Sequence, residues 1–241
     1  MDFVSRSYEK ELLDRLDIPF DAIDRNMHEL DIINTWLGGH AISVGGFQRL
    51  IGNRGRVSIC EIGCGGGDNL IALRRYCHKQ GIAVRFTGID INPHCIAVAK
   101  KKFPGQDATF LTSDYLLADL GDERPDVIFS SLFCHHFTDE ELVTMLRWMR
   151  DHCRIGFFIN DLHRHPLAYH SIRLLTTLFS RSWLVKNDAP LSVLRGFRRT
   201  EWEGLLQQAA ITDYSLSWKW AFRWLILAEK GTDRPQPNIV S

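Results

Sequence analysis

The sequence predicts an α/β fold, in which a mostly parallel sheet of seven strands with an antiparallel last strand carries helices on both faces. From residue 57 onward, short apolar stretches alternate with stretches that have the apolar spacing of helices. This alternation is typical of parallel strands joined by crossover helices. The strands are short and apolar, as expected where helices cover both faces of a sheet. Near the end of the chain, two strand-like stretches joined by a tight turn predict an antiparallel pair.

The predicted strands are residues 57–62, 83–89, 108–111, 126–130, 154–159, 214–220 and 222–228. Helices are expected between them at residues 68–80, 93–103, 138–149, 166–180 and 200–210. Asn92 supplies an N-cap before a proline at the first helical position. Thr138 with Glu141, and Thr200 with Glu203, have the spacing of capping boxes and mark the starts of two later helices. Residues 183–197 show a mixed pattern that predicts no single element.

The first part of the chain is predicted to be helical, at residues 8–16, 21–37 and 41–51, with Gly38 and Gly39 ending the second helix. We therefore expect three parts. Residues 1–55 form an N-terminal helical cap, and residues 56–231 form the α/β core. Within this core, a lid is inserted at about residues 162–199. Residues 232–241 form a flexible tail.

Charge and composition narrow the possible classes of function. The 241 residues include 29 Lys and Arg and 29 Asp and Glu, so the formal net charge is zero. This balance disfavours a nucleic-acid partner, because affinity for a phosphate backbone depends on clustered positive charge. No apolar run is long enough to span a membrane. The six cysteines include no CxxC pair, which favours reduced thiols in a cytoplasmic protein. Monomer and homodimer both stay open.

A glycine-rich turn follows the first predicted strand, and such a turn lets the backbone approach a ligand closely. It consists of Gly63, Cys64, Gly65, Gly66, Gly67 and Asp68. Dinucleotide-binding turns have a third glycine where this chain has Asp68. A carboxylate at the start of a helix would repel a pyrophosphate, but it suits a ligand that carries an ammonium and a sulfonium. The turn therefore favours S-adenosylmethionine over NAD.

Four motifs in order resemble those of the class I S-adenosylmethionine-dependent methyltransferases. The spacing Glu61-x-Gly63-x-Gly65-x-Gly67 resembles their first motif, and residues 88–93, 112–115 and 125–130 are similar to the next three. Residues 132–139 contain two adjacent histidines. They are similar to a segment of the subfamily that includes the ubiquinone and menaquinone C-methylases. The resemblance covers about residues 57–230 and implies a Rossmann-like sheet.

This resemblance also implies roles for residues at the strand ends. Asp90 is expected to accept hydrogen bonds from both ribose hydroxyls, and Asp114 one from the adenine amino group. S-Adenosylmethionine is the expected cofactor and S-adenosylhomocysteine the product. The full set of expected cofactor-binding residues is Glu61, Gly63, Gly65, Asp68, Asp90, Ile91, Asp114, Tyr115, Ser130 and Leu132.

Histidines after the fourth and fifth strands are candidates for a general base, because the active sites of such sheets lie at the carboxyl ends of the strands. His136 is the first candidate and His163 the second. Asp161, His163 and His165 also alternate as metal ligands would, but no fourth ligand is evident, and we expect no metal.

The expected acceptor is an oxygen or carbon of a small aromatic, polyketide or quinone-like molecule. Residues 130–133 lack the Asn/Asp-Pro-Pro-Tyr motif of many amino-group methyltransferases, and the expected lid is apolar. A small-amine N-methyltransferase and a catalytically silent cofactor-binding protein are the alternatives. Arg195 and Arg198 are candidates for an acceptor carboxylate, and Asn34 and Trp36 for lining the pocket.

Overall fold

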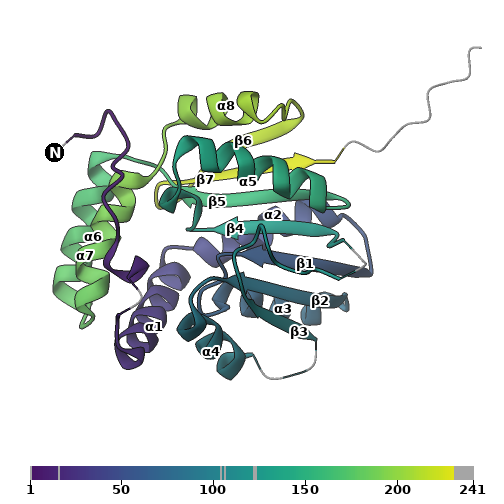
Figure 1. The fold of residues 1–241 in the computed structure, drawn as a ribbon, viewed down its shortest axis with the longest axis horizontal. Helices are drawn as coiled ribbons and strands as arrows, with labels where there is room; N and C mark the ends of the chain where they lie inside the picture. The colour runs from purple at the N-terminus through teal and green to yellow at the C-terminus, as the bar shows by residue number, and fades with distance from the viewer. Residues whose placement is uncertain (1, 16, 104, 106, 122–123, 231–241) are drawn as a thin grey trace, which may run out of the picture.

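The computed structural model describes residues 2–15, 17–103, 105, 107–121 and 124–230, and its centre is a sheet of seven strands (Figure 1). The strand order is β3-β2-β1-β4-β5-β7-β6, and β7 runs antiparallel to both of its neighbours. The strands are β1 (Arg56–Ile62), β2 (Ala83–Asp90), β3 (Ala108–Thr112), β4 (Val127–Ser131), β5 (Gly156–Leu162), β6 (Tyr214–Lys219) and β7 (Arg223–Glu229). The predicted fold class is confirmed.

Helices cover both faces of the sheet, as the apolar strands predict. One face packs against α2 (Gly39–Ile51), α3 (Asp68–Gln80) and α4 (Pro93–Lys102), and the other against α5 (Asp139–His152) and α8 (Arg199–Gln208). The expected capping box of Thr138 and Glu141 begins α5. The box expected at Thr200 is wrong. Instead, Arg198 is the N-cap of α8, because the carboxylate of Glu201 accepts from the Arg198 N–H.

The remaining helices gather at the end of the sheet toward which the parallel strands run (Figure 1). They are α1 (Phe20–Trp36), α6 (Pro166–Phe179) and α7 (Trp183–Arg195), and α7 lies where the sequence shows only a mixed pattern. None of the helices in the described ranges is long and apolar enough to cross a membrane. The expected tail, residues 232–241, lies outside the described residues.

The expected first helix, at residues 8–16, is wrong. The described part of this stretch is extended apart from a short 3-10 turn, η1 (Leu12–Asp14). Apart from that turn, its backbone is bound to α7. The Leu12 and Leu13 N–H groups donate to the buried Asp188 carboxylate, at 2.9 and 3.0 Å. Tertiary contacts of this kind override helix propensity.

Candidate active site

A cavity of about 980 Å³ opens at the carboxyl ends of the parallel strands. Its walls come from the β1–α3 turn, the end of β2, the loop after β3, and η2 (Cys134–His136) with the residues before it. The N-terminal segment, α1, α6, α7 and the β6–β7 turn close the other side. This is the position at which open α/β sheets bind their ligands.

The glycine turn brings backbone to the cavity because side chains would not fit there. Gly63 and Gly65 have positive φ angles of 67° and 50°, which L-residues with side chains rarely adopt. A Cβ on Gly63 would lie 2.2 Å from the ring of Phe133. Both glycines line the cavity.

Glu61, at the end of β1, has a buried carboxylate with one free oxygen. Its Oε1 accepts from Asn69 Nδ2 at 3.2 Å, whereas its Oε2 has no hydrogen-bond partner among the described residues. Burial raises the pKa of Glu61 well above its usual value. A buried acceptor without a partner is costly, so this oxygen fits a ligand that donates, such as the ammonium of S-adenosylmethionine.

Asp90 holds the glycine turn and also borders the cavity. Its Oδ2 accepts from Gly65 N at 2.9 Å and its Oδ1 from Asn92 N at 2.8 Å. Each carboxylate oxygen has a second lone pair, so both can still accept from ribose hydroxyls. Asp114 and Tyr115, after β3, line the cavity too.

Four other expected cofactor residues differ in their surroundings. Ile91 and Leu132 line the cavity, but Ser130 does not. The Ser130 hydroxyl is buried in the core, 3.6 Å from Cys134 Sγ, and its neighbour Ser131 lines the cavity instead. Asp68 reaches the cavity wall, where its Oδ1 pairs with Lys102 Nζ at 2.9 Å.

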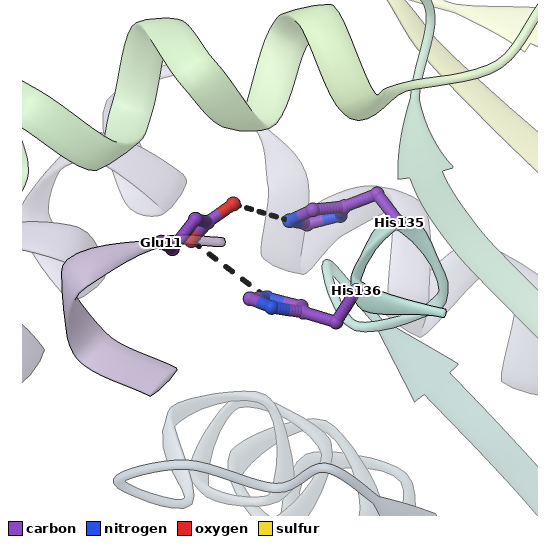
Figure 2. A group of neighbouring side chains, drawn as sticks. All are labelled: Glu11, His135 and His136. Atoms are coloured by element: carbon purple, nitrogen blue, oxygen red, sulfur yellow. Dashed lines mark ion pairs between the residues drawn. The ribbon is translucent and has the colours of Figure 1, made fainter. Parts of the chain in front are cut away.

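His135 is buried between the carboxylates of Asp161 and Glu11, and Figure 2 shows the Glu11 side of this arrangement. Its Nδ1 lies 2.8 Å from Asp161 Oδ1, and its Nε2 lies 3.4 Å from Glu11 Oε1. Burial alone would lower the pKa of His135. The negative charge of Asp161 and the hydrogen bonds to both carboxylates outweigh burial and raise the pKa to about 9. His135 is therefore an imidazolium at neutral pH.

His136 lines the cavity beside this pair, and its side chain is 20% exposed. Its Nε2 lies 3.8 Å from Glu11 Oε2, and Figure 2 shows the Glu11 carboxylate reaching toward both rings. Its Nδ1 lies 3.0 Å from Asp14 Oδ1, although the pair does not meet hydrogen-bond geometry. The sequence prediction missed Glu11 and Asp14, because residues about 120 positions apart share no local pattern.

The structure does not bring His163 to the cavity. Its Nδ1 accepts from Trp218 Nε1 at 3.2 Å, and burial lowers the pKa of His163 to about 4. The alternation of Asp161, His163 and His165 also makes no metal cluster, because Asp161 binds His135. Within the described ranges, Glu11, His135 and His136 are the group whose ligand atoms come within 4.8 Å of one another, as metal binding requires.

The expected acceptor arginines have other partners. Arg195 is buried, and its Nε donates to the His135 carbonyl at 3.0 Å, so it supports the histidine pair. Arg198 is exposed and lies away from the cavity. Asn34 lines the cavity, but Trp36 does not. Arg195 borders the cavity, so its expected contact with an acceptor stays a prediction, whereas Arg198 does not border it.

Comparisons with known proteins agree with this geometry. A family described as "Methyltransferase domain" matches residues 59–156. The plantazolicin methyltransferase BpumL in complex with SAH has a similar structure, with a TM-score of 0.65 and 18% identity. The match covers 86% of this chain and 90% of that one. Human N-acetylserotonin methyltransferase in complex with SAM gives a TM-score of 0.60 at 22% identity, covering 89% of this chain and 57% of that one. No curated protein matches in sequence.

Proposed function

The chain carries a class I S-adenosylmethionine-dependent methyltransferase domain, and on this premise we propose that it methylates an oxygen or carbon of a small aromatic, polyketide or quinone-like acceptor. One observation supports the proposal above all. A single cavity contains the cofactor-type carboxylates Glu61 and Asp90 and also His136, which is placed to act as a base. Its volume of about 980 Å³ lies at the upper end of ligand pockets, as expected for a site that holds two ligands.

The residues around the glycine turn would hold the methyl donor. Glu61 Oε2 would accept from its ammonium, the free lone pairs of Asp90 would accept from its ribose hydroxyls, and Asp114 would border its adenine. When bound, S-adenosylmethionine supplies an electrophilic methyl group. The protein's task is to exclude water and to align the acceptor atom opposite the sulfur.

His136 is the proposed base. His135 cannot take a proton at neutral pH, because Asp161 and Glu11 keep it protonated. His136 borders the cavity and can take the proton of an acceptor hydroxyl or enol at Nε2. The carboxylates of Glu11 and Asp14 then lie next to the imidazolium that forms and stabilise its charge.

The acceptor side of the cavity is apolar, and we propose that α6 and α7 form a lid over it. Aromatic and aliphatic side chains dominate this side, which suits a planar, weakly polar acceptor. They are Leu30, Ile33 and Leu37 of the N-terminal helical part, Ile172 and Leu175 of α6, Trp218 of β6, and Trp220 and Phe222 of the β6–β7 turn.

Two measurements test the proposal. Calorimetry should show binding of S-adenosylhomocysteine, and a panel of phenols, naphthols, quinols and small amines should show labelled methyl transfer to the hydroxylated members. We expect His136→Ala to lower kcat by at least about 100-fold with unchanged S-adenosylhomocysteine affinity. His78→Ala, which replaces an exposed histidine of α3, is the matched control.

Each part of the proposal can fail separately. Absence of S-adenosylhomocysteine binding would remove the cofactor assignment, and methylation of amines alone would overturn the acceptor class. Unchanged kcat in His136→Ala would remove the base. Loss of activity with EDTA that Zn²⁺ restores would instead assign Glu11, His135 and His136 to a metal.

A further inference from the structure

Arg223 is a buried arginine without a counter-ion at the wall of the cavity. It is the first residue of β7, is 3% exposed, and borders the cavity. Its Nη2 donates to Asn34 Oδ1 at 2.7 Å. Its Nε and Nη1 are buried and have no hydrogen-bond partner, and no carboxylate in the described ranges forms an ion pair with it.

The other buried arginines of the described chain are paired. Each forms an ion pair with a carboxylate and donates to backbone carbonyls; the pairs are Arg6 with Asp139, Arg164 with Glu201, and Arg195 with Asp14. Arg223 therefore differs from them in lacking a direct charge partner. Burial lowers the pKa of Arg223 to about 10, a decrease that the charge of Asp161 partly offsets, so the guanidinium stays protonated at neutral pH.

The surrounding backbone is shaped to hold this guanidinium in place. Arg223 reaches across to the junction between α1 and α2, where a Cβ on Gly39 would lie 3.1 Å from its Cζ. Asn34, in the last turn of α1, fixes Nη2. A side chain at position 39 would press against the guanidinium, and glycine leaves it in place with the N–H groups of Nε and Nη1 unused.

We propose that Arg223 forms a carboxylate-binding subsite of the cavity. A buried cation with free donors is costly alone and favourable with an anion, and a guanidinium matches a carboxylate in shape and in hydrogen-bond geometry. Methyl transfer offers two sources of this group, the amino-acid carboxylate of the methyl donor and a carboxylate on the acceptor. The inference rests on the proposed function, because both sources are ligands of that reaction.

The first source has a second feature in its favour. Glu61 Oε2 is a free acceptor and Arg223 has free donors, and both residues line the same cavity. An amino-acid end carries an ammonium and a carboxylate, so it is the zwitterion that would satisfy both groups. If the carboxylate came from the acceptor, the acceptor would be an aromatic or polyketide acid. The apolar wall alone would not distinguish such an acid from a neutral acceptor.

The experiment measures by calorimetry the dissociation constants of four probes. The proteins are wild type, Arg223→Met, Arg223→Lys and the control Arg25→Met, which removes an exposed arginine of α1. The probes are S-adenosylhomocysteine, 5′-methylthioadenosine, which lacks the amino-acid end, and 2-hydroxybenzoate and 2-hydroxybenzamide with S-adenosylhomocysteine present. We expect Arg223→Met to weaken one carboxylate-bearing probe at least about tenfold and to leave its neutral counterpart unchanged. Arg223→Lys should retain part of the affinity.

The pattern of losses identifies the source. If only S-adenosylhomocysteine loses affinity, Arg223 binds the carboxylate of the methyl donor. If only 2-hydroxybenzoate loses affinity, Arg223 binds a carboxylate of the acceptor. Equal losses for charged and neutral probes, or no loss for any probe, would overturn the subsite. The melting temperature gives an independent readout, because removing an unpaired buried charge should leave it unchanged or raise it. If wild type bound neither nucleoside probe, the proposed function itself would fail.

Discussion

The enclosed imidazolium of His135 makes a prediction about stability. Its folded-state pKa of about 9 lies above the value of 6.5 for an unperturbed histidine. A group whose pKa rises on folding contributes stability that is fully present below the unfolded pKa and is lost as the pH rises through the folded pKa. The pH window is therefore about 6.5 to 9. The difference in pKa corresponds to about 3 kcal/mol of unfolding free energy.

His135→Asn isolates this contribution, because the amide nitrogen takes the place of Nδ1 and can still donate a hydrogen bond to Asp161 but cannot titrate. Urea unfolding at pH 6, 7, 8 and 9 gives the unfolding free energy of both proteins. Wild type should exceed the variant most at pH 6, and the difference should shrink by about 3 kcal/mol by pH 9. Titrations shared by both proteins cancel in this difference. A difference that stays constant or grows with pH would show that His135 is not held as an imidazolium.

Three further substitutions test the site. Gly63→Ala should lower the unfolding free energy by about 2 kcal/mol or more and abolish S-adenosylhomocysteine binding, since its Cβ would meet Phe133; Gly45→Ala, where nothing lies within 4 Å, is the control in thermal unfolding. Glu61→Gln should weaken S-adenosylhomocysteine binding about tenfold in calorimetry, and the proton release expected when buried Glu61 ionises on binding should disappear. His163→Ala should leave kcat within about twofold of wild type; a loss as large as that of His136→Ala would restore His163 as the base.

The fold, and the strand-end residues that line the cavity, were predictable because their signals are local. Each parallel strand is a short apolar run, and each crossover helix repeats apolar residues at its own period. The glycine turn and Asp90 lie at strand ends, and the sheet brings such ends together whatever the helices do. The exception is Ser130. A strand alternates its side chains between faces, and a shift of one residue puts Ser131 at the cavity.

The other side of the site was not predictable, because its residues are set by distant partners. Arg223 lies within a predicted strand. Nothing in the neighbouring sequence indicates that its guanidinium would be buried without an ion-pair partner. Arg195 has the sequence context of an exposed loop arginine, but α7 buries it against the His135 carbonyl. Glu11 lies in a stretch with helix-like leucine spacing, and the sequence gives no sign that this stretch stays extended.

The contacts that keep the N-terminal segment extended also connect the proposed base, His136, to α7. Asp188 of α7 takes the N–H groups of Leu12 and Leu13, and Ser192 Oγ donates to Glu11 Oε1 at 2.7 Å. Had residues 8–16 formed the predicted helix, those N–H groups would have bonded within the helix, and Asp188 would be buried without them. The position of Glu11 beside His135 and His136 therefore depends on α7. A loss of α7 packing should impair methyl transfer before it affects the glycine turn.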